Sequence, residues 1–233
     1  MKIEIWSDIM CPFCYIGKRK FEKALADFNA PEKVEVIWRS YQLDPTMAFV
    51  PGKSVHEVLA EKKGWSPQQA AQMNQQVTAM AREVDLAYHL DKAIPANTFL
   101  AHRFTHLAAK HNLQDQAEER LFRAYFTEGK NIGDAETLAQ LGTEIGLPKE
   151  ELQNIFTTNA YTAEVQRDIT EAQQLGVRGV PFFVFNRKYA VSGAQPTEIF
   201  LQTLNQVWEE EKQEVMLVNS GPENNATCTD TSC

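Results

Sequence analysis

Four cysteines form two close pairs in this chain of 233 residues, Cys11 with Cys14 and Cys228 with Cys233. Thiols spaced this closely can exchange a disulfide with another molecule, or they can supply half of a zinc site. An isolated Cys-x-x-Cys motif leaves both possibilities open. The elements that flank Cys11-Pro12-Phe13-Cys14 therefore decide which chemistry the motif serves.

The first pair lies where a predicted strand ends and a predicted helix begins. Lys2 to Ser7 alternates in polarity, which is typical of a strand, and residues 17–29 carry apolar side chains at helical spacing. Pro12 suits the first helical position, so Cys11 is predicted to be the N-cap. The unpaired N–H groups and the helix dipole stabilise a thiolate there. We therefore expect Cys11 to attack a disulfide and Cys14, one turn later and more buried, to resolve it.

A second signal is Gly179-Val180-Pro181, directly before the apolar stretch 182–185. A cis bond before Pro181 would leave the backbone polar groups of Val180 free to pair with an extended substrate. An ordinary trans proline that ends a loop is the alternative, and the residues alone do not decide between them.

Strands are predicted at both ends of the chain and helices between them. A second strand covers Val34 to Trp38 and runs towards Leu43, and Phe182–Phe185 and Tyr189–Ser192 form a hairpin around a turn at Asn186–Lys188. The helices between are predicted at Val55–Lys62, Pro67–Val84, Thr98–Lys110, Gln114–Phe126, Ala135–Ile145, Glu150–Thr158 and Tyr161–Leu175, with a last one at Pro196–Trp208.

This order predicts one α/β unit interrupted by an all-helical insertion. Residues 1–43 and 177–211 would share the sheet as β-α-β and β-β-α halves, and residues 44–176 would form the insertion. Residues 212–233, acidic and then rich in Ser, Thr, Asn and Gly, are predicted to be a flexible tail that carries the second cysteine pair.

Asn97, His102 and His106 are candidate contact residues in the insertion. Asn97 is predicted to cap a helix, and the two histidines stand four residues apart, a spacing that can ligate metal. No acidic residue completes a zinc-protease signature, and no metal site is predicted. We expect this side of the helix to be solvated or to line the substrate site, with Asn97 and His102 in contact with substrate.

Composition excludes several classes of partner. The net charge is −8 with no basic cluster, so we expect no nucleic-acid binding, and no apolar run of 18 residues predicts a membrane span. No glycine pattern predicts a nucleotide site. Lys2 is followed at once by Glu4 and Asp8 without a small-residue cleavage site, which is unlike a secretory signal and favours a cytoplasmic protein.

Three stretches carry a resemblance to a known family. Trp6–Gly17, Pro95–Arg103 and Gly176–Phe183 together resemble the DsbA family of the thioredoxin superfamily, in its FrnE-like cytosolic branch. The resemblance spans about residues 1–210.

The resemblance implies a thioredoxin fold with a helical insertion, a nucleophilic Cys11, a resolving Cys14 and a cis Pro181. Pro12, Phe13 and Val180 would then contact the substrate. No bound cofactor is implied, because electrons are exchanged with protein thiols, with glutathione or with a thioredoxin-type reductant. Phe13 stands where the periplasmic members have a histidine, so we expect a potential between about −270 and −120 mV.

Other functions stay open at this stage. A sister branch that resembles this chain isomerises 2-hydroxychromene-2-carboxylate or transfers glutathione with a serine in the first position, whereas Cys11 and Cys14 are both present here. A non-catalytic holdase is a further alternative. Cys228 and Cys233 could relay electrons to the first pair, join it in a zinc site or be incidental, and the protein could be a monomer or a dimer.

Overall fold

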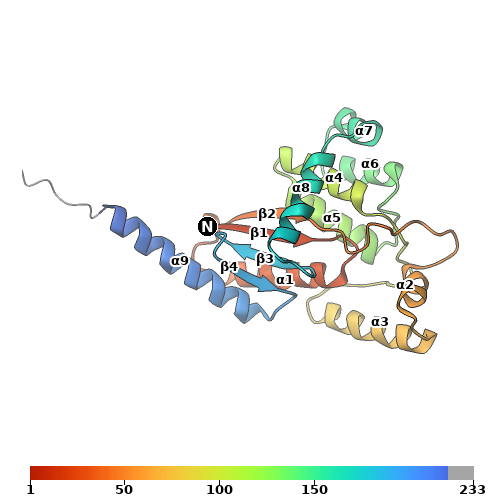
Figure 1. The fold of residues 1–233 in the computed structure, drawn as a ribbon, viewed down its shortest axis with the longest axis horizontal. Helices are drawn as coiled ribbons and strands as arrows, with labels where there is room; N and C mark the ends of the chain where they lie inside the picture. Colours follow the sequence, from red (N-terminus) through yellow and green to blue (C-terminus); the bar gives the residue numbers. More distant parts are fainter. Residues whose placement is uncertain (220–233) are drawn as a thin grey trace, which may run out of the picture.

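A computed structural model describes residues 1–219, except for the side chains of His56 and residues 214–219. Its sheet contains β1 (Lys2–Ser7), β2 (Glu35–Ser40), β3 (Phe182–Phe185) and β4 (Tyr189–Ser192) in the spatial order β2-β1-β3-β4 (Figure 1). β1 and β2 are parallel, and β3 is antiparallel to both of its neighbours. The first and last parts of the chain thus share one mixed sheet, as expected for a thioredoxin fold.

The helices agree closely with the sequence pattern. They are α1 (Pro12–Ala26), the short 3₁₀ helix η1 (Pro31–Lys33), α2 (Val55–Lys63), α3 (Pro67–Arg82), α4 (Phe99–Lys110), α5 (Gln114–Phe126), α6 (Ala135–Glu144), α7 (Lys149–Thr157), α8 (Thr162–Gln174) and α9 (Thr197–Asn219). Helices α2 to α8 form the insertion between the two halves of the sheet (Figure 1).

Several helix starts are fixed by local capping. Ser54 and Ser66 form capping boxes with Glu57 and Gln69, and the Asp134 carboxylate accepts a hydrogen bond from the Thr137 N–H at 2.8 Å. Such caps satisfy N–H groups that the helix cannot pair internally. Local sequence signals of this kind explain why these helix starts were predicted within one residue.

Helix α9 is longer than the sequence analysis predicted. The expected helix ended at Trp208 and residues 212–233 were expected to be flexible, but α9 continues to Asn219. No glycine or proline interrupts residues 209–219, and Glu, Lys, Gln, Met and Leu favour helix. Nothing in the sequence therefore ends the helix at Trp208. The remaining tail, with Cys228 and Cys233, lies outside the described residues, and the predicted boundaries between units stay predictions.

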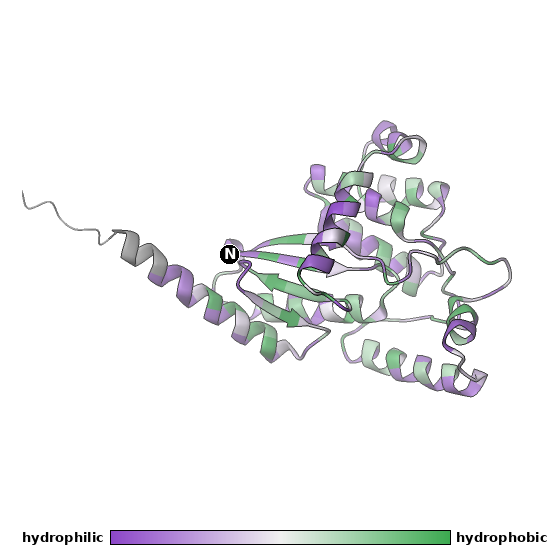
Figure 2. Cartoon of the chain, viewed as in Figure 1, coloured by the Kyte–Doolittle hydropathy of each residue, from purple (hydrophilic) through white to green (hydrophobic). Residues whose placement is uncertain are grey.

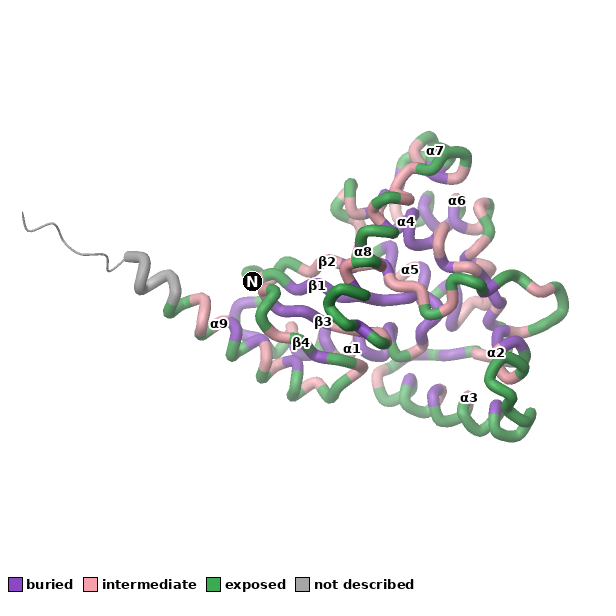
Figure 3. Tube along the Cα trace, viewed as in Figure 1, coloured by how far each residue is buried: buried purple, intermediate pink, exposed green. Residues whose placement is uncertain are grey.

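Strand β3 is hydrophobic throughout (Figure 2), and β1 and β3 are largely buried, whereas α3 is exposed along most of its length (Figure 3). One face of the sheet packs against α1 and α9 through a cluster that includes Ile5, Phe21, Phe183 and Phe200. The opposite face carries Trp6, which packs with Ala172 of α8. Within residues 1–219 no helix is long and apolar enough to span a membrane.

A third cluster joins the insertion to the start of α1. It contains Cys11, Cys14 and Tyr15 together with Phe104 of α4 and Phe122 of α5. The insertion therefore packs directly behind the Cys-x-x-Cys motif.

Candidate active site

Cys11 begins helix α1 as predicted. It is the N-cap residue, Pro12 occupies the first turn, and the Cys14 N–H donates to the Cys11 carbonyl at 3.0 Å. The Cys11 N–H donates in turn to the Asp8 carbonyl at 2.9 Å, which fixes the loop after β1. Both thiols are free. Strand β1 and helix α1 thus hold two thiols one helical turn apart.

The two thiols have different surroundings. Cys14 is completely buried, and this burial raises the pKa of its thiol, as does the neighbouring Cys11. The Ser7 hydroxyl and the Asp8 N–H act in the opposite direction but are outweighed, so the pKa of Cys14 stays well above its ordinary value. Cys14 therefore holds its proton at neutral pH.

Val180 and Pro181 lie beside the first thiol although they are far away in the sequence. The Cys11 thiol donates to the Val180 carbonyl oxygen at 3.4 Å, and the Val180–Pro181 bond is cis. Gly17 of α1 makes room for this contact, because a Cβ there would lie 2.9 Å from the Pro181 Cγ. The fold thus brings the two sequence signals, 179–181 and 11–14, into one site.

Tyr88 is a site residue that the sequence analysis missed. Its hydroxyl donates to the Pro12 carbonyl at 2.7 Å, and its ring stacks on Phe126 with centroids 4.6 Å apart. Burial raises the pKa of Tyr88 above its usual range, so it acts as a neutral donor. Tyr88 lies in the loop between α3 and α4, where nothing in the local sequence points to the motif.

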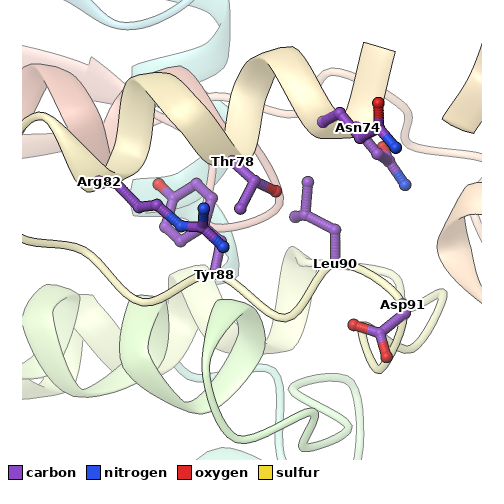
Figure 4. A pocket seen from close by; sticks show the side chains of 7 residues that line it. Asn74, Thr78, Arg82, Tyr88, Leu90 and Asp91 are labelled. Carbon is purple, nitrogen blue, oxygen red and sulfur yellow. The ribbon is translucent and has the colours of Figure 1, made fainter. Parts of the chain in front are cut away.

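Tyr88 also lines a shallow pocket of about 310 Å³ on the surface. Its other lining residues come from α3 and from the loop that follows Tyr88; Asn74, Thr78, Arg82, Leu90 and Asp91 are among them (Figure 4). The Tyr88 side chain therefore lies between this pocket and the first turn of α1.

His102 is not where the sequence analysis expected it. The prediction of a solvated or substrate-facing side is wrong for this residue, because His102 is only 1% exposed and Arg103, next to it, is buried as well. Helix α4 contacts α5, α6, α7 and α8, so most of its circumference is covered. His102 Nε2 instead faces Asp8 Oδ1 at 3.5 Å, behind the thiols.

Asn97 is half-buried, and its side chain holds the loop before α4. Its Oδ1 accepts from the Phe99 N–H at 2.9 Å and from the Gln42 amide at 3.1 Å, while its amide donates to the Pro45 carbonyl at 2.8 Å. The helix itself begins after Thr98 rather than after Asn97. A contact between Asn97 and substrate stays a prediction.

The exposed residue nearest in sequence to the thiols is Phe13, with 37% of its surface accessible, and Pro12 is half-buried. Over residues 1–219, no group of three or more His, Cys, Asp or Glu side chains is arranged to hold a metal ion. The geometry around Cys11 suits nucleophilic thiol chemistry with a partner that approaches over Phe13 and Val180.

Comparison with known proteins gives one family. The model of a DSBA-like thioredoxin domain matches residues 2–205. A Bacillus subtilis protein called uncharacterized protein YwbO is 28% identical over 206 residues, covering 87% of this chain and 95% of that protein.

Solved structures are similar over most of the chain. The crystal structure of a probable DsbA oxidoreductase from Streptomyces coelicolor has 42% identity and a TM-score of 0.85, covering 90% of this chain and 91% of the other. The cytosolic disulfide reductase DsbM from Pseudomonas aeruginosa, solved with GSH, shares the fold at 16% identity, with a TM-score of 0.62 over 93% of this chain and all of its own. The chain belongs to the DSBA-like thioredoxin domain family.

Proposed function

We propose that this protein is a thiol–disulfide oxidoreductase that acts on protein substrates. The observation that carries the proposal is the Cys11 sulfur at the N-terminus of α1, 3.4 Å from the Val180 carbonyl, with the buried thiol of Cys14 one turn behind it. Membership of the DSBA-like family supports the same chemistry. So does the similarity to a probable DsbA oxidoreductase.

The reaction proceeds in two exchanges. The Cys11 thiolate attacks a substrate disulfide, a bond forms between Cys11 Sγ and one substrate sulfur, and the other substrate sulfur leaves as a thiolate. Cys14 then loses its proton and attacks Cys11 Sγ, which releases the second substrate thiolate. The substrate is reduced by two electrons and the Cys11–Cys14 pair is oxidised to a disulfide. The reverse sequence oxidises a substrate dithiol.

Substrate recognition falls to the residues around Cys11. An extended substrate segment would pair with the backbone of Val180 beside Pro181 and pack on Pro12 and the exposed Phe13 ring. We propose that no cofactor is bound and that glutathione or a thioredoxin-type protein restores the pair. The similar DsbM structure was solved with GSH, which supports glutathione as the molecule that restores the pair.

We further propose a cytoplasmic location, in keeping with the cytosolic DsbM. The tail pair Cys228–Cys233 is proposed to exchange electrons with Cys11–Cys14.

The first experiment is a titration of the Cys11–Cys14 couple in glutathione buffers. We expect a two-electron transition with a potential between about −270 and −120 mV. A Cys14→Ser variant should accumulate a mixed disulfide with a model substrate, whereas a Cys11→Ser variant should form none. The same titration on a chain ending at Ser220 tests the tail, because the relay requires the approach to equilibrium to slow when Cys228 and Cys233 are absent.

Two other outcomes would replace the proposal. If the pair forms no disulfide and a small aromatic substrate turns over with glutathione, the chain is an isomerase or transferase resembling 2-hydroxychromene-2-carboxylate isomerase. If Cys11→Ser leaves the cellular activity intact, a non-catalytic holdase function takes its place.

A further inference from the structure

A cluster of buried polar side chains gathers around Asp8, whose backbone N–H contacts the Cys14 sulfur. Asp8 Oδ1, His102 Nε2, Glu118 Oε2 and the Tyr125 hydroxyl are all buried without a hydrogen-bond partner among the described residues. Buried polar atoms are normally paired, so these four call for an explanation. They come from three parts of the chain, namely the end of β1, α4 and α5.

Asp8 and His102 face each other in this cluster. One Asp8 oxygen, Oδ2, accepts from the Leu43 N–H at 2.8 Å, and the other, Oδ1, lies 3.5 Å from His102 Nε2. Both side chains are at most 2% exposed. A proton on Nε2 would pair these two atoms through a charge-assisted hydrogen bond, so the arrangement is ready to accept one.

Glu118 is the next titratable group in the cluster. Burial raises its pKa to about 8, and the charges of Asp115 and Asp8 add to the effect, while Lys18 and the Thr105 hydroxyl oppose it. Glu118 is therefore protonated at neutral pH. Tyr125, whose pKa is raised first by burial and then by the Asp8 charge, stays neutral as well.

Cys14 is next to the start of this cluster. Its sulfur is close to the Ser7 hydroxyl and the Asp8 N–H, which both favour its thiolate, and its side chain is completely inaccessible to solvent. A buried thiol that must become a thiolate needs an acceptor for its proton inside the protein.

We propose that the Asp8–His102 pair accepts the proton of Cys14 when Cys14 resolves a mixed disulfide, so that the helical insertion supplies part of the redox site. This inference rests on the proposed function. The Cys14 S–H bond breaks, the proton moves to His102 Nε2 and is held there by Asp8, and the Cys14 thiolate attacks Cys11 Sγ. A bond forms between the two cysteine sulfurs, and the substrate sulfur leaves with the electron pair. In the opposite direction His102 returns the proton to Cys14.

The test separates the two exchanges in time. Reduced protein is mixed rapidly with dithiobis(nitrobenzoate), whose thiolate product is coloured and needs no proton to leave. Cys228 and Cys233 would also react, so the wild type and all variants are compared in a full-length Cys228→Ser, Cys233→Ser background. There the first equivalent released reports attack by Cys11, and the second reports resolution by Cys14. The protein is studied from mildly acidic to alkaline pH as wild type, His102→Gln, Asp8→Asn, Glu118→Gln and His111→Gln.

We expect His102→Gln and Asp8→Asn to slow the second phase by about tenfold or more at neutral pH and to leave the first phase unchanged. The deficit should shrink as the pH rises, because hydroxide can then take the proton. A purely structural defect would slow the phase equally at every pH. His111 is the matched control, since it ends the same helix α4 and pairs with Glu151 at 3.2 Å, and His111→Gln should change neither phase.

Glu118→Gln keeps the shape of the neutral acid. The rate of its second phase should match that of the wild type below neutral pH. The two rates should differ only above about pH 8, where the wild-type Glu118 carboxyl ionises. If one of His102→Gln and Asp8→Asn does not fold, the other decides the question, because each removes one member of the same acceptor pair.

A second phase with wild-type rate and pH profile in the folded variants overturns the inference while the proposed function stands. If the wild type itself releases no second equivalent, the proposed function fails with it.

Discussion

Cys11 and Cys14 differ in environment although one helical turn separates them. Both are buried, but Cys11 lies at the N-terminus of α1 and contacts the Val180 carbonyl, while Cys14 lies inside the first turn and its pKa is raised by burial. This difference supports the proposed roles of Cys11 in attack and of Cys14 in resolution. Substitutions at two nearby residues, Gly17 and Phe13, test how this environment depends on packing and on charge.

Gly17→Ala should damage the site even though alanine favours helix. The new Cβ would lie 2.9 Å from the Pro181 Cγ, so α1 and Pro181 must separate. Overpacking of this kind costs about 1–3 kcal/mol, which exceeds the gain of up to about 1 kcal/mol in helix propensity. Compared with the wild type, we expect Gly17→Ala to have a lower free energy of unfolding, measured in urea, and a slower reaction of Cys11 with a disulfide probe. Gly179→Ala is the control, because a Cβ there meets nothing within 4 Å, and equal behaviour of the two variants would contradict the argument.

Phe13→His should make the Cys11–Cys14 disulfide more oxidising. An imidazolium next to Cys11 stabilises the thiolate and hence the reduced form. The equilibrium with glutathione is expected to shift towards the reduced protein by about tenfold, which corresponds to about 30 mV. Phe13 is 37% exposed, so the fold should tolerate the change. Phe13→Leu, which adds no charge, should leave the equilibrium constant near the wild-type value.

At the scale of elements, a buried ion-pair network fastens α8 to the sheet. Asp168 of α8 accepts from Arg39 at 3.0 Å and from the Ser40 N–H at 3.0 Å, and it pairs with His106 at 3.1 Å. Arg39 also bonds Glu4 of β1, which pairs with Arg187 in the β3–β4 turn. Five separate segments of the chain therefore meet at Asp168 and Glu4, namely β1, β2, α4, α8 and the β3–β4 turn.

Asp168→Asn should destabilise the fold in a pH-dependent way. Burial alone would raise the pKa of Asp168, but the hydrogen bonds from His106 and Ser40 and the charge of Arg39 outweigh it and hold the pKa below its ordinary value. A depressed pKa contributes stability above the unfolded value of about 3.9, and this contribution is lost as the pH falls through the folded value. Urea unfolding should show a loss of about 3 kcal/mol at neutral pH.

The difference in the free energy of unfolding between Asp168→Asn and the wild type should become smaller in acid. Glu151→Gln is the control, since Glu151 pairs with the exposed Lys110, and its unfolding curve should match the wild type. A deficit for Asp168→Asn that stays constant down to low pH would show that packing, rather than ionisation, is responsible.

At the scale of the whole molecule, the insertion and the Cys11–Cys14 site share a core. Tyr15, next to Cys14, stacks on Phe122 of α5 at 4.9 Å, and its hydroxyl donates to Glu119 at 2.6 Å. Trp38 of β2 donates to Asp115 at 3.1 Å. Because these contacts join the insertion to α1 and to the sheet, the insertion should not unfold independently of the sheet.

We therefore expect one cooperative unfolding transition. Far-ultraviolet circular dichroism follows the helices, most of which are in the insertion, and tryptophan fluorescence follows Trp6 and Trp38 in the sheet. In a Trp65→Phe, Trp208→Phe variant, which leaves only those two tryptophans, the urea midpoints of both signals should coincide. Loss of helix at lower urea than the fluorescence change would show that the insertion is a separate unit.

The sequence by itself determined the elements and the motif. Alternation in Lys2–Ser7, the capping serine at position 66 and the proline after Cys11 are local signals, and each specified its strand, helix or N-cap with an error of at most a few residues. The β-α-β order also predicted the parallel pairing of β1 and β2, because crossover connections of that kind place their strands side by side. The fold and the Cys11–Cys14 site followed from those signals and from the resemblance they carry.

Only the tertiary structure decided what surrounds the two thiols. The approach of Val180 to Cys11, the bond from Tyr88 to Pro12 and the burial of His102 against Asp8 each join segments far apart in the chain. A helical pattern can show which side of α4 is apolar, but it cannot show that α5 to α8 cover the polar side as well. Such contacts depend on the packing of distant surfaces, which leaves no periodic signal in the residues on either side.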